Sequence, residues 1–205
     1  MLSELLLGVP CAQKRDRLGT MESAETLPIF KYHPDPVATG AIKKDADTPC
    51  LGCNRIRGYI YAGPVFTERS FTLENHLCPW CVADGTAAKN FGATFNDTGE
   101  IEGIPDEVRS EVEARTPGFQ AWQQEKWLAC CGDAAAFLGL AGAAELGRDF
   151  PKAAAAVKKY LRQEFDLSKE EVEDFLEGLT KDGEPSAYIF RCMRCSTYLA
   201  YVDQA

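Results

Sequence analysis

The sequence has little positive charge, no long apolar run and few histidines. Its 22 lysines and arginines face 31 aspartates and glutamates, which gives a net charge of −9. This balance does not favour non-specific binding of nucleic acid, because such binding draws its affinity from pairing lysine and arginine with phosphates. Nine of the acids and two of the lysines lie within residues 164–184. We interpret that stretch as a solvated helix face that keeps the protein soluble.

The absence of a long apolar run excludes a membrane-spanning helix. The short run at residues 5–7 is too brief to cross a bilayer, and no basic leader precedes it. The sequence therefore predicts neither a membrane span nor a signal peptide, and it indicates a cytoplasmic protein. Residues 1–22 are expected to form a disordered extension, within which Met21 is a candidate true start and Cys11 has no role.

Histidine is scarce, with only His33 and His76 in the chain. A hydrolase with a cysteine nucleophile would have to use one of them as its base. The combination that we consider is Cys131 with Asp133 and His33, although nothing in their spacing brings the three together. His33 is expected to be a packing residue or a ligand instead.

Cysteine, in contrast, is plentiful. The chain has nine, and six of them form three pairs with a two-residue gap. In a chain without a signal peptide, such pairs are more often metal sites than disulfides. The pairs are Cys50 with Cys53, Cys78 with Cys81, and Cys192 with Cys195.

The first two pairs predict a structural zinc site. They are separated by 24 residues, and four thiolates that converge tetrahedrally are the ligands that structural zinc prefers. The spacer reads as a strand pair at residues 58–64 and 68–73, and residues 82–91 can start a helix. A turn with one pair, a hairpin and a helix with the other pair are typical of a treble-clef zinc finger. A closed site of four thiolates has no open position for water, so the zinc stabilises structure and hydrolyses nothing.

The second pair has a rival interpretation. Cys78-Pro79-Trp80-Cys81 resembles the redox turn of glutaredoxin-type proteins, in which a helix start lowers the pKa of the first thiol. The protein would then be a thiol–disulfide oxidoreductase that uses Cys78 and Cys81. Those turns follow a hydrophobic strand, whereas residues 68–77 are rich in polar side chains and another pair lies close upstream. These two features favour zinc.

The third pair is two ligands short of a metal site. The candidates to complete it are Cys130, Cys131, His33 and His76. Cys130 and Cys131 are expected at the end of a helix before a glycine, where a thiolate can project, but two neighbours on a helix can hardly both point the same way. Alternatively, all three pairs crowd near one metal, or the third pair stays reduced on a β-turn. We expect one zinc ion at the first site; a second ion is the open alternative, which requires Cys130 or Cys131 to complete the third pair.

The remainder of the chain predicts an α+β protein, since no alternating strand–helix pattern is present. The residues expected to be helical are 105–115, 120–131, 134–146, 151–165 and 168–179. The third of these is rich in alanine and glycine and nearly uncharged, so it is expected to be a buried helix. Ser168 and Glu171 match a capping box. Strands are expected at residues 188–190 and 198–202.

These elements suggest how the chain is organised. Residues 23–205 are expected to form a single domain. It would hold a treble-clef-like zinc hairpin and helix, then a helical block, and finally a β-hairpin that carries the third cysteine pair. The expected bounds are 48–92 for the zinc-knuckle region, 105–180 for the helical region and 187–203 for the C-terminal hairpin.

Six ordered blocks of sequence carry a resemblance to a known family. They are Phe30-Lys31-Tyr32-His33-Pro34-Asp35-Pro36, Arg57-Gly58-Tyr59-Ile60-Tyr61-Ala62-Gly63-Pro64, Leu77-Cys78-Pro79-Trp80-Cys81-Val82-Ala83-Asp84-Gly85, Arg115-Thr116-Pro117-Gly118-Phe119, Trp122-Gln123-Gln124-Glu125 and Phe190-Arg191-Cys192-Met193-Arg194-Cys195. With these blocks the chain resembles the bacterial CbrC-like family over residues 27–203. The resemblance implies that the paired cysteines bind metal, and the family's name implies an association with colicin tolerance. It implies no active site.

The sequence therefore predicts a cytoplasmic zinc-binding protein that acts on a protein partner as a non-enzymatic adapter or stress-tolerance protein. The alternatives are the oxidoreductase that uses Cys78 and Cys81 and the hydrolase that uses Cys131.

Overall fold

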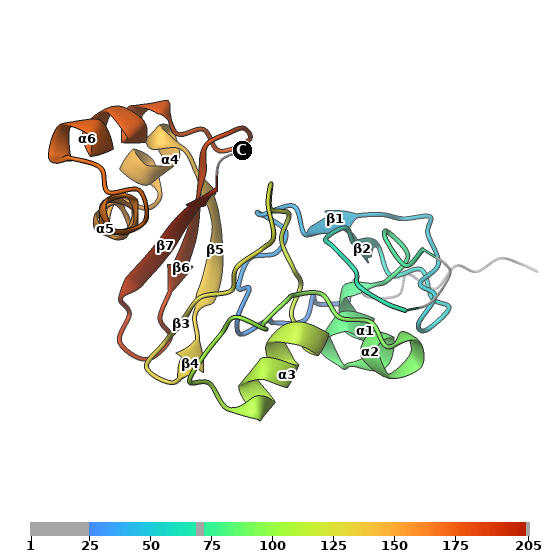
Figure 1. Cartoon of the computed structure of the whole chain (residues 1–205). Helices are drawn as coiled ribbons and strands as arrows, with labels where there is room; N and C mark the ends of the chain where they lie inside the picture. The colour runs from blue at the N-terminus through green and yellow to red at the C-terminus, as the bar shows by residue number, and fades with distance from the viewer. Residues whose placement is uncertain (1–24, 69–71, 204–205) are drawn as a thin grey trace, which may run out of the picture.

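A three-stranded antiparallel sheet is the middle layer of one half of the molecule (Figure 1). The computed structural model describes residues 25–68 and 72–203. Within them the sheet has the order β5 (Ala136–Ala141), β6 (Ser186–Arg191) and β7 (Tyr198–Asp203). Strand β6 is central and pairs with both neighbours, from Ser186 opposite Asp203 to Arg191 opposite Tyr198 on the β7 side. The two expected C-terminal strands are thus confirmed, and β5 is an unexpected third.

Both faces of this sheet are buried. Along β6 the side chains alternate, so that Tyr188 and Phe190 pack into one hydrophobic cluster while Ala187 and Ile189 pack into another. Since successive residues of a strand point to opposite faces, a continuous apolar run such as this one is typical of a strand covered on both sides. On the first face Phe119 stacks on Phe137, with ring centroids 3.9 Å apart.

Three helices cover the second face, as Figure 1 shows: α4 (Ala143–Arg148), α5 (Ala154–Glu164) and α6 (Lys169–Gly178). Helix α6 begins with the expected capping box. The backbone N–H of Ser168 donates to Glu171 at 2.8 Å, and the N–H of Glu171 donates to the Ser168 hydroxyl at 3.3 Å. The helices expected at residues 105–115, 151–165 and 168–179 are therefore confirmed as α3 (Asp106–Arg115), α5 and α6.

The other half of the molecule has shorter elements. Strands β1 (Ile42–Lys44) and β2 (Tyr59–Tyr61) form an antiparallel pair, followed by α1 (Pro79–Ala83) and α2 (Thr86–Phe91). They enclose a separate core around fully buried Tyr61, which donates its hydroxyl to Pro64 O at 2.7 Å. Figure 1 shows these elements at the end of the molecule away from α4, α5 and α6.

The described residues do not form the expected hairpin between the first two cysteine pairs, and residues 69–71 of its second strand lie outside them. Strand β2 pairs instead with β1, which precedes the first pair in the chain. Pro64 has no N–H to donate and interrupts strand pairing soon after β2, and Phe66 then forms an isolated bridge with Thr94. Turn, hairpin and helix do not follow in the expected order, so a treble clef is not confirmed. The coarser expectation holds: the fold mixes helices with small sheets.

The helices expected at residues 120–131 and 134–146 are also wrong. The chain forms β3 (Ala129–Cys130), β4 (Asp133–Ala134), β5 and only then α4. The alanines favour a helix, but pairing with β6 buries the same side chains in a sheet, and tertiary packing overrides propensity. Gly139 in β5 has φ +137°, a backbone conformation that an α-helix does not contain. It lies at an irregularity in the pairing register of β5 and β6. The expected helical region 105–180 thus contains three strands.

Among the residues that the structure describes, no helix combines the length and apolar composition that a membrane crossing requires. The expectations about residues 1–22, including Cys11 and the apolar run at 5–7, lie outside the described residues.

Substitution of Gly118 is predicted to destabilise the junction between the two halves. A Cβ at this position would lie 2.1 Å from the backbone oxygen of Phe95, and the Gly118 N–H donates to the Tyr61 hydroxyl at 3.0 Å. Gly118→Ala should lower the free energy of unfolding by about 3 kcal/mol, because backbone must move to relieve the overlap. Urea denaturation measures the change.

The matched control is Gly147→Ala in α4, where a Cβ meets no atom within 4 Å. It should be neutral or stabilise by up to about 1 kcal/mol, since alanine favours a helix more than glycine does. Equal midpoints for the two variants would contradict the packing described here.

Candidate metal centres

Four sulfur atoms from the first two cysteine pairs meet at one point. The Sγ atoms of Cys50, Cys53, Cys78 and Cys81 all lie within 4.8 Å of one another. The Sγ atoms of Cys53 and Cys78, which are 25 positions apart in the chain, are separated by 3.8 Å. We call this group the first cysteine cluster.

The geometry of this cluster fits a tetrahedral metal ion. Four sulfurs that each lie about 2.3 Å from a central zinc ion are about 3.8 Å from one another. A disulfide would instead bring two sulfurs to about 2.05 Å. The observed Cys53–Cys78 distance of 3.8 Å matches the edge of the tetrahedron. Four thiol groups at this spacing could hold a metal ion.

The first pair lies on a tight backbone turn. The N–H of Asn54 donates to Cys50 O at 2.7 Å, and the N–H of Cys50 donates to Arg55 O at 3.0 Å. Asn54 has φ +55°, a left-handed conformation that asparagine tolerates better than most residues. The Gly52 N–H points at Cys50 Sγ, 3.3 Å away. This turn brings the sulfurs of Cys50 and Cys53 into one group.

The second pair lies at the start of α1. Pro79 occupies the first helical position, where its missing N–H costs nothing. The backbone N–H of Cys78 donates to Cys50 Sγ at 3.2 Å, so the helix start is tied directly to the first turn. Gly52 lies against Cys81, since a Cβ added there would be 3.0 Å from Cys81 Sγ. The turn and the helix therefore approach as closely as a glycine permits.

The remaining four cysteines of the described chain form a second cluster. The Sγ atoms of Cys130, Cys131, Cys192 and Cys195 lie within 4.8 Å of one another. The Cys130 sulfur is 3.6 Å from that of Cys131 and 3.8 Å from that of Cys195. These distances again match the tetrahedral spacing, so this group too could hold a metal ion.

The sequence analysis expected Cys130 and Cys131 at the end of a helix, and the structure shows that this expectation is wrong. Cys130 pairs with Asp133 across a two-residue hairpin loop, in which Cys131 has φ +58° and Gly132 has φ +69°. Positive φ at both loop positions defines a type I′ turn, the tightest common hairpin connection. The reversal of the chain brings two neighbouring sulfurs to the same point, which the backbone of a helix does not permit.

The Cys192 turn repeats the backbone of the Cys50 turn. The N–H of Ser196, four residues on, donates to Cys192 O at 3.1 Å, and the N–H of Cys192 donates to Thr197 O at 2.8 Å. Ser196 has φ +60°, where Asn54 has +55°. The Cys195 N–H is directed at Cys192 Sγ, 3.4 Å away. Two segments with unrelated surroundings thus adopt one hydrogen-bond pattern around their first cysteine.

The clusters differ in exposure. In the first, Cys50, Cys78 and Cys81 are buried and Cys53 is half-buried. In the second, only Cys192 is buried, Cys130 is half-buried, and Cys131 and Cys195 are exposed. An ion in the second cluster would therefore be the more accessible to a chelator.

Electrostatics within each cluster favours one thiolate and opposes the next. Hydrogen bonds with Cys78 and Cys81 lower the pKa of Cys50 well below its usual range, while the bond with Cys50 raises that of Cys81 far above it. In the second cluster, hydrogen bonds with Thr197 lower the pKa of Cys195 to about 6, and the bond with Cys131 raises that of Cys130 to about 12. Thiol groups this close cannot all ionise, because their negative charges repel one another. A divalent cation among them offsets this repulsion.

Asp133 connects the second cluster to the N-terminal segment. Its carboxylate accepts a hydrogen bond from the Tyr32 hydroxyl at 2.7 Å and pairs with Lys31 at 3.3 Å and with Arg194 at 3.8 Å. Burial alone would raise the pKa of Asp133, but the bonds donated by Tyr32 and Lys31 outweigh it and lower the pKa. The sequence analysis missed this role, for which an aspartate directly after Gly132 was the available signal.

A cationic side chain packs beside the first cluster. The Arg57 guanidinium lies 4.0 Å above the Trp80 ring, and its Nε donates to Glu25 at 2.7 Å. The Trp80 ring itself packs against the cysteines. Arg57 thus packs on Trp80 and pairs with Glu25, a role that the spacing of the cysteines did not indicate.

Neither histidine belongs to a cluster. His33 is fully buried; its Nδ1 donates to Pro117 O at 2.8 Å, and its Nε2 accepts from the Thr39 hydroxyl at 2.7 Å. His76 is exposed and bonds Glu74 O at 2.7 Å. Both ring nitrogens of His33 are engaged away from Cys131, so it is not placed to act as the base of a cysteine hydrolase. The grouping of Cys131, Asp133 and His33 is not formed.

Comparison with known proteins identifies the family. A family model described as "Uncharacterised protein family (UPF0167)" matches residues 27–204, and the chain belongs to this family. UPF0167 proteins of Mycobacterium bovis and Mycobacterium tuberculosis are each 46% identical to it over 183 residues, which cover 88% of this chain and 95% of theirs. A UPF0167 protein of Pseudomonas aeruginosa is 38% identical over 174 residues, covering 82% and 92%. No solved structure matches the chain.

These matches correct the expected CbrC-like assignment. The family model and the similar proteins carry the UPF0167 name, and none of them carries the CbrC name. The association with colicin tolerance is therefore unsupported.

The buried His33 predicts a specific loss of stability in acid. Burial lowers its pKa from 6.5 to about 4, so below pH 6.5 the unfolded chain binds a proton that the folded chain refuses. Folding stability must then fall as the pH drops from about 6.5 towards 4, by about 2 kcal/mol at pH 5. Urea unfolding at pH 7.5 and pH 5 should show this difference, and His33→Gln should reduce it by that amount.

His76→Gln is the matched control, since exposed His76 should leave the pH dependence unchanged. Thiol protonation affects all three proteins alike and cancels in the comparison. An unaltered pH dependence in His33→Gln would contradict a neutral, buried imidazole.

Proposed function

We propose that this member of the UPF0167 family is a cytoplasmic zinc-binding protein whose two closed cysteine centres fix a surface for a protein partner. Cys50, Cys53, Cys78 and Cys81 would hold one zinc ion, and Cys130, Cys131, Cys192 and Cys195 the other. The observation that carries the proposal is the repeated geometry: two groups of four sulfurs at tetrahedral spacing, each with the same turn around its first paired cysteine.

The donor set supports zinc over most other ions. Four thiolates in a tetrahedron suit zinc or iron, whereas magnesium and calcium require oxygen ligands. Thiolates persist in a reducing compartment such as the cytoplasm. Within the first cluster Cys78 and Cys81 lie in the first turn of a helix, which keeps half of the treble-clef layout in the proposal.

A structural role follows from the closed ligand sets. Each cluster supplies four protein ligands, so neither leaves a position for water or substrate on the ion. The chemistry that zinc supplies there is charge neutralisation of the thiolates, which lets two distant turns pack together. Met193 and Arg194 are exposed between the cysteines of the third pair, and we place the partner surface around them.

The redox alternative uses Cys78 and Cys81, but both are buried in the first cluster. Cys78 also donates its N–H to Cys50 Sγ. A redox pair would need its first sulfur open to an incoming thiol or disulfide. The packing around Cys78 therefore favours the metal-binding role.

Metal content is the first test. Native mass spectrometry with elemental analysis should find two zinc ions per chain. Cys78→Ser and Cys192→Ser should each bind one ion fewer, because each removes one ligand of a different cluster. His76→Ser is the control and should keep both ions. A chain that binds no metal, or one whose metal content the cysteine variants leave unchanged, would overturn the proposal.

Thiol reactivity is the second test. The metal-loaded protein should resist alkylation by iodoacetamide until a chelator is added. The chelator should remove the metal in two steps, because the second cluster is the more exposed. Cys131 and Cys195 should therefore be alkylated before Cys78 and Cys81. Rapid modification of Cys78 without chelator, together with reversible oxidation by disulfide reagents, would favour the oxidoreductase instead.

A further inference from the structure

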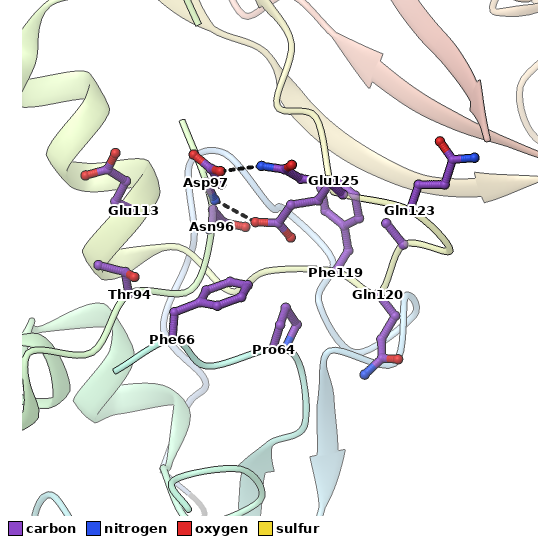
Figure 2. A pocket seen from close by; sticks show the side chains of 12 residues that line it. Pro64, Phe66, Thr94, Asn96, Asp97, Glu113, Phe119, Gln120, Gln123 and Glu125 are labelled. Carbon is purple, nitrogen blue, oxygen red and sulfur yellow. Dashed lines mark hydrogen bonds between the residues drawn. The ribbon is translucent and has the colours of Figure 1, made fainter. Parts of the chain in front are cut away.

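A pocket of about 700 Å³ lies between α3 and the loop that precedes β3 (Figure 2). Its walls come from the segment after β2, from residues 94–97, from Glu113 on α3 and from residues 119–125. None of the lining residues belongs to a cysteine cluster. Its volume is in the range of pockets that hold small ligands. Neither the family nor the proposed zinc centres account for it.

The polar wall of the pocket is acidic. Three carboxylates line it, from Asp97, Glu113 and Glu125, and the described residues that line it include no lysine or arginine. The N–H of Asp97 donates to Glu125 Oε1 at 2.7 Å, and Gln124 Nε2 donates to Asp97 Oδ2 at 2.7 Å. Figure 2 shows Asn96, Asp97 and Glu125 on one side of the pocket and Phe66 with Pro64 on the other.

Asn96 supplies the second observation. Its side chain is only 2% exposed, and its Nδ2 donates to Val112 O at 2.7 Å and Thr116 O at 2.9 Å. Because both of these partners are carbonyls, the amide orientation is fixed. Asn96 lines the pocket, and its Oδ1 lies within the wall beside Gly118, where an added Cβ would be 3.0 Å from it. Among the described residues Oδ1 has no hydrogen-bond partner. A buried acceptor without a donor is costly, so the site lacks a donor that a ligand can bring.

A cationic group would also suit the half-buried carboxylate of Glu125. Burial raises its pKa from 4.5 to about 7, which means that its charge is poorly compensated by the protein. A cation beside it would stabilise the ionised form. The three carboxylates do not come together as a divalent-metal site: within the described part of the chain, the groups close enough to hold an ion are the two cysteine clusters.

The opposite wall is apolar and partly open. The Phe66 side chain is 48% exposed, although it is large and hydrophobic. An aromatic face in this position attracts a cation and packs against a flat ligand. Phe119, at 3% exposure, closes the pocket towards the core of the sheet.

We propose that this pocket binds an organic cation: a guanidinium, amidinium or primary ammonium group attached to an apolar body. The charged group would donate to the Glu125 carboxylate and, after a small shift of the wall that encloses this atom, to Asn96 Oδ1. The body would lie over Phe66. Such a group can come from a free small molecule or from an arginine side chain of a partner protein. The chemistry that recognises it is the same in both cases.

The test uses the full-length, metal-loaded protein and a pair of matched probes. Benzamidine carries a planar cation on a ring, and benzamide is its neutral isostere. Titration followed by NMR should show benzamidine shifting the signals of Asn96, Phe66 and Glu125, with benzamide binding at least about tenfold more weakly, because a charge-assisted hydrogen bond is lost. Equal binding of the two probes would overturn the proposal.

A second arm distinguishes the sources of the cation. It titrates an arginine tripeptide with blocked ends and, as its control, the same peptide with citrulline. Binding of benzamidine alone identifies a small-molecule site, and binding of the arginine peptide identifies a partner side chain. If neither cation binds at millimolar concentration, the proposal is wrong.

Two variants test the assigned contacts. Glu125→Gln and Phe66→Ala should each weaken benzamidine binding by about tenfold. Glu102→Gln is the control, because Glu102 is exposed and does not line the pocket. Glu125→Gln should also melt no lower than the parent protein at pH 7.5, since it replaces a poorly compensated charge by a neutral amide. Unchanged affinity in folded Glu125→Gln would contradict the assignment.

Discussion

The convergence of four sulfur atoms on one point is the constraint on which the rest of the structure depends. Around the first cluster, β1 and β2 have three residues each, and α1 and α2 have five and six. Elements this short are not stable alone in water. The contact of the Cys50 turn with the start of α1 joins them, together with the core around Tyr61. The second cluster does the same for the β3–β4 hairpin, which it holds against the turn between β6 and β7.

The sulfurs by themselves would oppose this arrangement. Within each cluster the pKa of one thiol is lowered at the expense of another, as the opposite shifts of Cys50 and Cys81 show. A divalent cation would bind all four sulfurs as thiolates and neutralise their repulsion, so that metal binding and folding would be coupled. The buried first cluster would then support the fold, and the exposed second cluster would lie where a partner can approach it. The acidic pocket uses none of the cluster ligands.

Spacing and local signals predicted part of this structure. The two-residue gaps were enough to expect that Cys50, Cys53, Cys78 and Cys81 meet, and the capping box of Ser168 was enough to start α6. The alanine-rich stretch at 134–146 misled, because its helix propensity is weaker than the pairing with β6. Cys130 and Cys131 meet the third pair only because Gly132 permits a tight hairpin turn. The Asn96 pocket depends on carbonyls of Val112 and Thr116, which no sequence pattern reveals.

X-ray absorption at the zinc edge tests the central claim most directly, since it reports the ligand atoms around the ion itself. The account predicts a first shell of four sulfurs at about 2.3 Å, with no nitrogen or oxygen contribution. A shell that contains nitrogen or oxygen, or a purified reduced protein with no bound zinc, would contradict it.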